Sequence, residues 1–327
     1  MLQTTVAPST SPTPDGTPRE SLRLTTTAPR EYVHRAAVAE VFLTDEWSRH
    51  GEERFTLTAQ WPRAHSFYAA VGGVHYDPLM AAETIRQVGA WLAHAGFDVP
   101  LGHQFLMWEL NYSVRRERLT IGGAPADLRL DIVCTDVRRR GGRLAGLSYE
   151  VVVSADGHTV ATGSARYTCT SPDVYRRVRA PQLAALAAAD PEPPAPPVAP
   201  ARVGRLSDFD VVLAPTGQPN RWQLRADTRH PVLFDHPGDH IPGMVLLEAA
   251  RQAVHTMAPR GRTVLPVAMD STFHRYAEFG SPCWIATEPA VGPGERGGLV
   301  LVTGRQGDDT VFTSVVEVAD LPATPGA

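Results

Sequence analysis

One helix signature, His-x7-Glu-x2-Arg-Gln, occurs twice in this chain, and this repeat limits the folds that the chain can adopt. The matched pairs, all at an offset of 165 residues, are His75 with His240, Glu83 with Glu248, Arg86 with Arg251 and Gln87 with Gln252. His65 falls on His230 at the same offset. Five polar identities at one offset are hard to obtain by chance, so the sequence predicts an internal duplication. Farther upstream the halves correspond at an offset of 170, where Val33, Arg35, Val41 and Leu43 match Val203, Arg205, Val211 and Leu213.

Two breaks in composition fit a duplicated chain of 327 residues, a length typical of two domains. Residues 1–30 contain eleven Ser or Thr and five Pro, a composition that favours a disordered leader. Seven prolines between Pro181 and Pro200 prevent a regular hydrophobic period and indicate a linker. We therefore expect a first domain over 31–178, a linker over 179–201 and a second domain over 202–322.

Each half shows the pattern of a helix followed by strands. In the first half Asp77-Pro78 predicts the start of a helix over 79–94, and strands are expected at 105–114, 127–137, 144–155 and 158–169. In the second half a helix over 244–257 precedes strands at 264–275, 283–289, 299–304 and 310–318. One further strand precedes each helix, at 55–61 and 222–226. A central helix with an antiparallel meander is the hotdog plan, so we expect an α+β protein of two tandem hotdog domains.

The charged residues within these apolar helices allow two interpretations. Glu and Arg three positions apart lie on one helix face, so each pair can neutralise itself and anchor the helix. Alternatively, the Glu faces a cleft between the domains as a general base or acid. The repetition, with a histidine just upstream, favours the functional interpretation. Which of His230, His236 and His240 faces the cleft stays open.

Other features bear on the type of chemistry. Pro242-Gly243 places free backbone N–H groups at a helix start, where they can stabilise an oxyanion. A covalent acyl-enzyme is not expected, because the chain has no Gly-x-Ser-x-Gly motif. The cysteines Cys134, Cys169 and Cys283 lie far apart in strand-like segments, which favours buried reduced thiols over a disulfide or metal site. No metal or cofactor is expected.

Composition excludes several classes of partner. The formal net charge of −4 offers no basic field for nucleic acid. No apolar run approaches the roughly 20 residues of a membrane helix, and we expect a cytoplasmic protein. Two arginine clusters, Arg138-Arg139-Arg140 with Arg143, and Arg176, Arg177 and Arg179, are either solvated or a docking surface for an acidic carrier protein. An exposed sheet edge would also allow a homodimer.

The second helix, Pro242-Gly243-Met244-Val245-Leu246-Leu247-Glu248-Ala249-Ala250-Arg251-Gln252, resembles the central helix of hotdog acyl carrier protein dehydratases. A closer resemblance covers about 33–318. Val33-His34-Arg35, Ala82-Glu83-Thr84-Ile85-Arg86-Gln87 and Asp239-His240-Ile241-Pro242-Gly243-Met244 look like the AfsA family, the A-factor biosynthesis proteins with two hotdog repeats.

This resemblance implies transfer of a β-ketoacyl group from an acyl carrier protein thioester to the hydroxyl of dihydroxyacetone phosphate, followed by cyclisation towards γ-butyrolactone or butenolide signalling molecules. It implies Glu83, Glu248 and Arg251 as catalytic residues, with Glu248 favoured because only the second copy has the dehydratase-like Pro-Gly frame. The residues expected to bind substrate are Arg86, His240, His75, Gln252, Gln87, Gly243 and Met244. The alternatives are a hotdog dehydratase or thioesterase, and a module that binds an acyl ligand without turnover.

Overall fold

The computed structural model describes residues 24–188, 193–259, 262–290 and 298–321. Each half contributes one long helix, α1 (Leu79–Trp91) or α3 (Gly243–Met257), close to the predicted bounds. In α1 every residue except Arg86 is buried, as expected for a helix enclosed by the fold. The Asp77 carboxylate accepts the Leu79 N–H at 3.0 Å, which explains the helix start, and a π-helical turn, η3 (Leu92–Gly96), ends it.

The strands form one antiparallel sheet. The first half supplies β1 (Leu43–Arg49), β2 (Arg54–Trp61), β3 (Gln104–Val114), β4 (Ala126–Arg140), β5 (Arg143–Ala155) and β6 (His158–Thr170). The second supplies β7 (Leu213–Pro215), β8 (Arg221–Leu224), β9 (Val264–Phe273), β10 (Cys283–Ala290), β11 (Gly298–Gln306) and β12 (Asp309–Asp320). The strand order is β1-β2-β4-β5-β6-β3-β9-β12-β11-β10-β8-β7, so the second half mirrors the first strand for strand. The topology therefore contains the predicted duplication.

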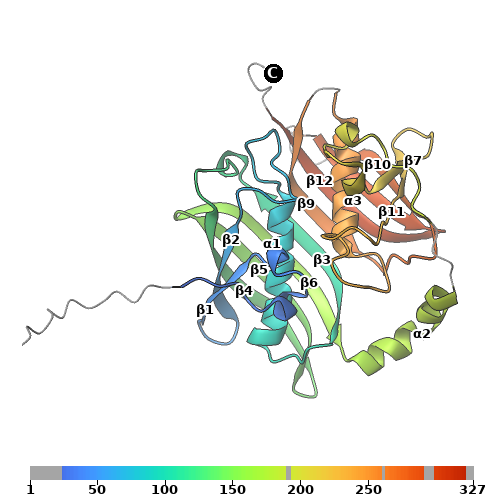
Figure 1. Ribbon diagram of the computed structural model, residues 1–327. Helices are drawn as coiled ribbons and strands as arrows, with labels where there is room; N and C mark the ends of the chain where they lie inside the picture. The colour runs from blue at the N-terminus through green and yellow to red at the C-terminus, as the bar shows by residue number, and fades with distance from the viewer. Residues whose placement is uncertain (1–23, 189–192, 260–261, 291–297, 322–327) are drawn as a thin grey trace, which may run out of the picture.

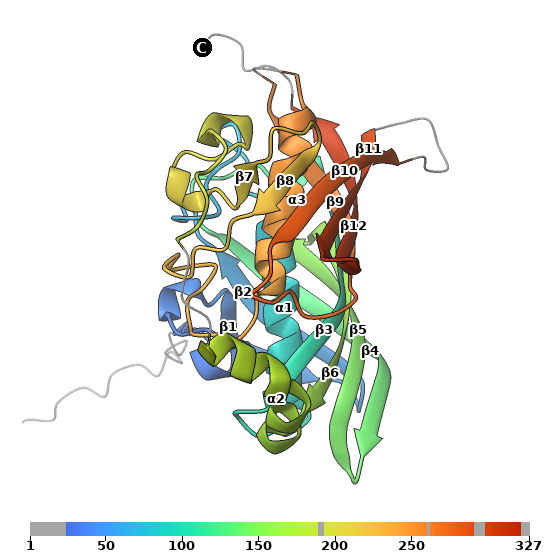
Figure 2. The same ribbon diagram turned by 90° about the vertical axis from the view of Figure 1, so that its right-hand side faces the viewer.

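Short 3-10 turns repeat as well. The turns η1 (Arg30–Val33) and η2 (Val38–Glu40) recur 170 positions later as η5 (Pro200–Arg202) and η6 (Asp208–Asp210), while η4 (Arg116–Arg118) lies between β3 and β4. Both long helices lie on the same face of the sheet, α1 against β3 and β6 and α3 against β9 to β12 (Figures 1 and 2). The predicted double hotdog is confirmed.

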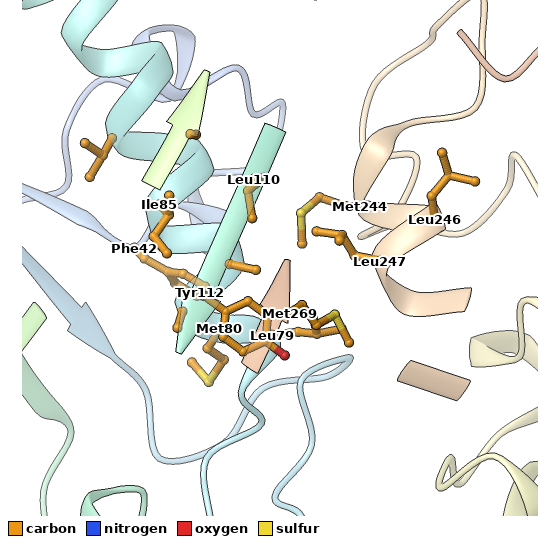
Figure 3. Close-up of a cluster of buried hydrophobic side chains, with 14 of the residues drawn as sticks. Phe42, Leu79, Met80, Ile85, Leu110, Tyr112, Met244, Leu246, Leu247 and Met269 are labelled. Atoms are coloured by element: carbon orange, nitrogen blue, oxygen red, sulfur yellow. The ribbon is translucent and has the colours of Figure 1, made fainter. Parts of the chain in front are cut away.

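The two halves share one core. Strands β3 and β9 pair at the centre of the sheet, with Tyr112 opposite Met269. Figure 3 shows these side chains beside Met80 of α1 and beside Met244 and Leu247 of α3. Burial of apolar surface therefore joins the halves as well as stabilising each one.

The predicted leader is wrong where the structure describes it. Residues 1–23 lie outside the described ranges, but Thr27 bridges Thr44 and the Ala28 N–H donates to the Leu43 carbonyl at 2.9 Å. Ala28 is buried, because a small side chain fits against β1. On the opposite edge Val198 binds β7 in the same way. Each edge strand thus has a chain segment beside part of its length, at Leu43–Asp45 of β1 and at Leu213 of β7, so the edge expected to allow a dimer is covered in part.

The predicted linker is also partly wrong, because it begins inside a helix. Helix α2 (Pro172–Ala188) continues through Pro181, so the chain stays helical well past residue 179. The alanines after Pro181 are strong helix formers and support the helix where proline opposes it. Residues 189–192 lie outside the described ranges.

Two searches of the described residues bear on partners. No helix there is long and apolar enough to cross a membrane. Within the same ranges no group of three or more His, Cys, Asp or Glu side chains is arranged to hold a metal ion.

Candidate active site

Glu248 sits at the centre of α3 and is fully buried, with 0 % exposure. Its Oε1 accepts from Arg205 Nε at 2.8 Å and from Gln252 Nε2 at 2.6 Å. Its Oε2 accepts from Arg205 at 2.6 Å and from Arg251 Nε at 2.9 Å. A second nitrogen of Arg251 lies 2.9 Å from Oε1. The carboxylate is therefore enclosed by two guanidinium groups and an amide.

Glu83 of α1, which is 1 % exposed, has the same surroundings. Arg35 Nε, Arg86 and Gln87 Nε2 donate to its Oε1 at 2.9, 2.7 and 2.7 Å, and Arg86 Nε donates to Oε2 at 2.9 Å. The two clamps, Glu83 with Arg35 and Arg86, and Glu248 with Arg205 and Arg251, are thus equivalent.

These clamps keep both glutamates ionised. Burial alone would raise the pKa of Glu83 and Glu248, but the paired arginines and the hydrogen bonds lower each to about 2. A carboxylate with so low a pKa and no exposed surface is poorly suited to remove a proton from a substrate. The geometry favours the neutralised ion pair, one of the two interpretations that the sequence leaves open.

Arg35 and Arg205 also cross between the halves. Arg35 donates to the Val232 carbonyl at 2.9 Å, and Arg205 donates to the carbonyl of Phe67, the residue that matches Val232 at the offset of 165. The Arg205 guanidinium lies 4.0 Å from the centre of the Phe67 ring. Neither arginine is among the predicted site residues, although their match at an offset of 170 is the sequence signal that marks them.

His65 and His230 hold the loops that receive these arginines. His65 Nδ1 accepts the N–H groups of Phe67 and Tyr68. His230 Nδ1 accepts those of Val232 and Leu233 in the same way. Each histidine also faces an acid, with His65 3.3 Å from Glu40 and His230 3.1 Å from Asp210. Both ring nitrogens of the buried His230 thus contact groups of the fold, which indicates a structural role for this histidine.

The two glutamines of the signature are used within the fold as well. Gln87 Oε1 accepts the Phe42 N–H at 2.9 Å, and Gln252 Oε1 accepts the Val212 N–H at 3.0 Å. Each amide nitrogen donates to its own glutamate and to a backbone carbonyl. Their predicted role in binding substrate stays a prediction.

The remaining predicted residues differ between the halves. His75 makes backbone bridges with Val71 and Thr120, and its buried Nδ1 has no hydrogen-bond partner among the described residues. His240 instead has its Nδ1 2.6 Å from Asp239 Oδ1, and its side chain is 29 % exposed. His236, in the same loop, is more exposed at 55 %. The upstream histidines are thus equivalent in sequence but not in surroundings.

Gly243 and Met244 form the start of α3. An added Cβ at Gly243 would lie 3.1 Å from the Phe273 ring, so the helix approaches β9 closely here. Met244 is buried in the shared core beside Leu247 (Figure 3). Its side chain lies among apolar residues from both halves.

Arg179 is neither a solvated residue nor an exposed docking group, contrary to both expectations. It is the buried residue of α2, and it forms a bidentate ion pair with Glu278. Its Nε lies 3.8 Å from Asp239 Oδ2. Arg176 and Arg177 are exposed, as is the hairpin cluster from Arg138 to Arg143.

A cavity of about 330 Å³ lies away from these residues. Ser113, Arg115 and Thr162 are among the residues that line it, at the ends of β3 and β6. None of the signature residues lines this cavity, so it does not mark the candidate site.

Comparisons with known proteins support one family. A family profile described as the A-factor biosynthesis hotdog domain matches residues 16–171 and 186–317. A 2-oxo-3-(phosphooxy)propyl 3-oxoalkanoate synthase from Streptomyces virginiae is 56 % identical over 295 residues, covering 90 % of this chain and 98 % of that protein. Proteins of the same name from Streptomyces griseus and Streptomyces coelicolor are 42 % and 41 % identical, each covering 88 % of this chain and 93 % and 90 % of their own lengths.

Solved structures align with this chain at low identity. An acyl-ACP thioesterase from Bacteroides thetaiotaomicron aligns with a TM-score of 0.49 and 11 % identity, covering 81 % of this chain and 98 % of the other. The 12:0-ACP thioesterase from Umbellularia californica gives 0.49 and 13 %, covering 84 % and 100 %. Since the profile match and the relatives span nearly all of both halves, the chain belongs to the AfsA family of A-factor biosynthesis hotdog proteins.

Proposed function

We propose that this protein transfers a 3-oxoacyl group from a thioester to the hydroxyl of dihydroxyacetone phosphate. The observation that carries the proposal is the 56 % identity to a 2-oxo-3-(phosphooxy)propyl 3-oxoalkanoate synthase over 98 % of that protein's length. That product is the ester of a 3-oxo acid with dihydroxyacetone phosphate. Intramolecular condensation of the ester would then give a butenolide phosphate, a precursor type for γ-butyrolactone signalling molecules.

The acyl donor in this proposal is a 3-oxoacyl carrier protein. Carrier proteins are acidic, and the exposed Arg138–Arg143 hairpin and Arg176–Arg177 of α2 lie at the same end of the molecule (Figures 1 and 2). The substrates and three reduced, buried cysteines suit the cytoplasm.

In this proposal the glutamates of the two clamps have a structural role and do not act as the base that removes the substrate proton. Glu83 and Glu248 bind Arg35 and Arg205. These arginines in turn bind the Val232 and Phe67 loops of the opposite half, so α1 and α3 are linked to those loops. Glu248 lies five residues after Gly243, the first residue of α3, so its contacts hold this helix in place. Arg86 and Arg251 are occupied by their glutamates and by the Val33 and Val203 carbonyls.

The direct test is an assay with purified protein, a 3-oxoacyl thioester and dihydroxyacetone phosphate, read by mass spectrometry. The expected product is the phosphorylated ester or its cyclised form. The thioester is supplied once on a carrier protein and once on N-acetylcysteamine, and a higher kcat/KM with the carrier protein supports the donor. Thioester consumption at an unchanged rate without dihydroxyacetone phosphate would instead indicate a thioesterase.

A further inference from the structure

An ionised carboxylate fixes the orientation of one histidine at the start of α3. Asp239 Oδ1 lies 2.6 Å from His240 Nδ1. Burial alone would raise the pKa of Asp239, but hydrogen bonds from His240 and Tyr175 and the nearby Arg179 lower it to about 2. The ionised carboxylate can only accept, so Nδ1 of the neutral ring carries the proton. Nε2 is then an unprotonated nitrogen, the form that a general base requires.

The second ring nitrogen, Nε2, belongs to a partly exposed side chain. Among the described residues no hydrogen-bond partner of His240 Nε2 is found, and 29 % of the side chain is exposed. The first N–H groups of α3 follow within three to four residues, because the helix begins at Gly243. A candidate base and a helix N-terminus, whose N–H groups can stabilise an oxyanion, are therefore neighbours in the chain.

Helix α2, which connects the two halves, helps to hold the Asp239 carboxylate and the His240 ring in place. The Tyr175 hydroxyl donates to Asp239, 2.8 Å from each oxygen. Arg179, one helical turn later, is anchored by Glu278 and lies over the Tyr276 ring, 4.4 Å from its centre. The same Tyr276 ring packs 4.4 Å from the His240 ring. Three segments of the chain, α2, the 276–278 stretch and Asp239 beside the ring, thus hold the imidazole in a fixed orientation.

The chain contains counterparts that lack this arrangement. His75, at the matched position, follows Val74 where His240 follows Asp239, so the first half has no adjacent carboxylate. His236 binds Asp235 at 2.5 Å, but it is exposed on the loop, and Asp235 also accepts the Ala36 N–H. His240 is therefore the histidine of the signature with both a carboxylate partner and a helix start beside it.

We propose that the Asp239–His240 pair is the acid–base dyad of acyl transfer, an inference that rests on the proposed function. His240 Nε2 takes the proton of the dihydroxyacetone phosphate hydroxyl as its oxygen attacks the thioester carbonyl. The C–O bond forms and the C–S bond breaks, and the proton returns from His240 to the departing thiolate. The products are the ester and the free thiol. Asp239 stabilises the imidazolium, and Tyr175 acts as a positioning residue for Asp239.

The test compares His240→Ala with His236→Ala, a matched change in the same loop. We expect His240→Ala to lower kcat by about 10² to 10⁴, with little change in the KM for dihydroxyacetone phosphate. Imidazole added to His240→Ala should restore part of the rate, because a small base can occupy the space left by the ring. His236→Ala should keep the wild-type rate, and Asp239→Asn should show an intermediate loss in kcat. Circular dichroism confirms that each variant is folded.

Several results would overturn the dyad. These are a His240→Ala rate within tenfold of wild type, a loss seen in KM alone, or a loss that imidazole does not restore. If wild-type protein forms no ester, the proposed function fails. The protonation site of the His240 ring then tests the dyad separately. In ¹⁵N spectra of the wild type, with His240 identified by its absence in His240→Gln, protonation on Nδ1 supports the dyad and protonation on Nε2 overturns it.

Discussion

Arg35 and Arg205 occupy equivalent positions in the two halves, and each binds the glutamate of its own helix while donating to a backbone carbonyl of the other half. The glutamates of the repeated signature are thus part of two equivalent sets of contacts, here called the fastening, that join the halves. Its buried charges are tolerable because each carboxylate faces two guanidinium groups.

Replacing one crossing arginine should strongly destabilise the protein. Arg205→Met leaves the Glu248 carboxylate buried with one arginine instead of two, and we expect a loss of about 3 kcal/mol in the free energy of unfolding. Arg35→Met should behave alike. The control is Arg262→Met, which removes an exposed ion pair with Asp320 and should cost at most about 1 kcal/mol. Equal urea midpoints for Arg205→Met and Arg262→Met would contradict the fastening role.

The glutamates should matter for stability in both halves equally. Glu83→Gln and Glu248→Gln each remove one buried negative charge that binds two arginines, so both should lower the melting temperature by similar amounts. The rate of ester formation per folded molecule, measured well below the melting temperature, should stay within about tenfold of wild type. A loss above about a hundredfold in Glu248→Gln alone would restore Glu248 as the catalytic base.

Acid should weaken this fastening. The carboxyls of Glu83 and Glu248 have a pKa of about 2 in the folded protein against an ordinary 4.5. A lowered folded-state pKa gives stability that is fully present above about pH 4.5 and is lost as the pH falls towards 2. Urea unfolding between pH 6 and pH 3 should show this decline. The double variant Glu83→Gln/Glu248→Gln should show a shallower one, and parallel curves for the two proteins would be inconsistent with the ion pairs.

Close packing between α1 and the sheet depends on a glycine in β6. A Cβ at Gly163 would overlap Ile85 Cδ1 of α1 and lie 2.5 Å from the Asn111 carbonyl oxygen. Gly163→Ala should therefore cost about 1–3 kcal/mol, seen as a lower melting temperature. Gly123→Ala, where a Cβ would meet nothing within 4 Å, is the control and should unfold near the wild-type temperature. Similar melting temperatures for both variants would show that the contact relaxes freely.

The three cysteines should not react in the native protein. Burial raises the pKa of the Cys134, Cys169 and Cys283 thiols to about 12, 11 and 12, so almost no thiolate exists at pH 8. A thiol reagent such as dithionitrobenzoate should label none of them before denaturation and all three afterwards. Rapid labelling of the folded protein, or an acylated cysteine found by mass spectrometry during turnover, would reopen a covalent route.

The elements with a strong local pattern were predictable. The duplication, both long helices and the strands from Gln104 to Thr170 follow from apolar periodicity and from turn and cap residues close in sequence. The linker was harder, because Pro181 argues against a helix while the surrounding alanines favour one, and the predicted boundary at residue 179 is wrong. The prediction of a disordered leader is wrong at Ala28, because packing against β1 determines the burial of that residue.

The sequence by itself determined the duplication, the double hotdog and which polar residues lie on the buried helices. These depend on periodicities and offsets that are visible along the chain. Only the tertiary structure decided what those residues contact. It paired Arg35 with Val232 across the halves, and it placed Tyr175 and Arg179 of the connecting helix beside Asp239. Such contacts join segments about 60 to 200 residues apart, and burial and charge neutralisation select them only once the chain is folded.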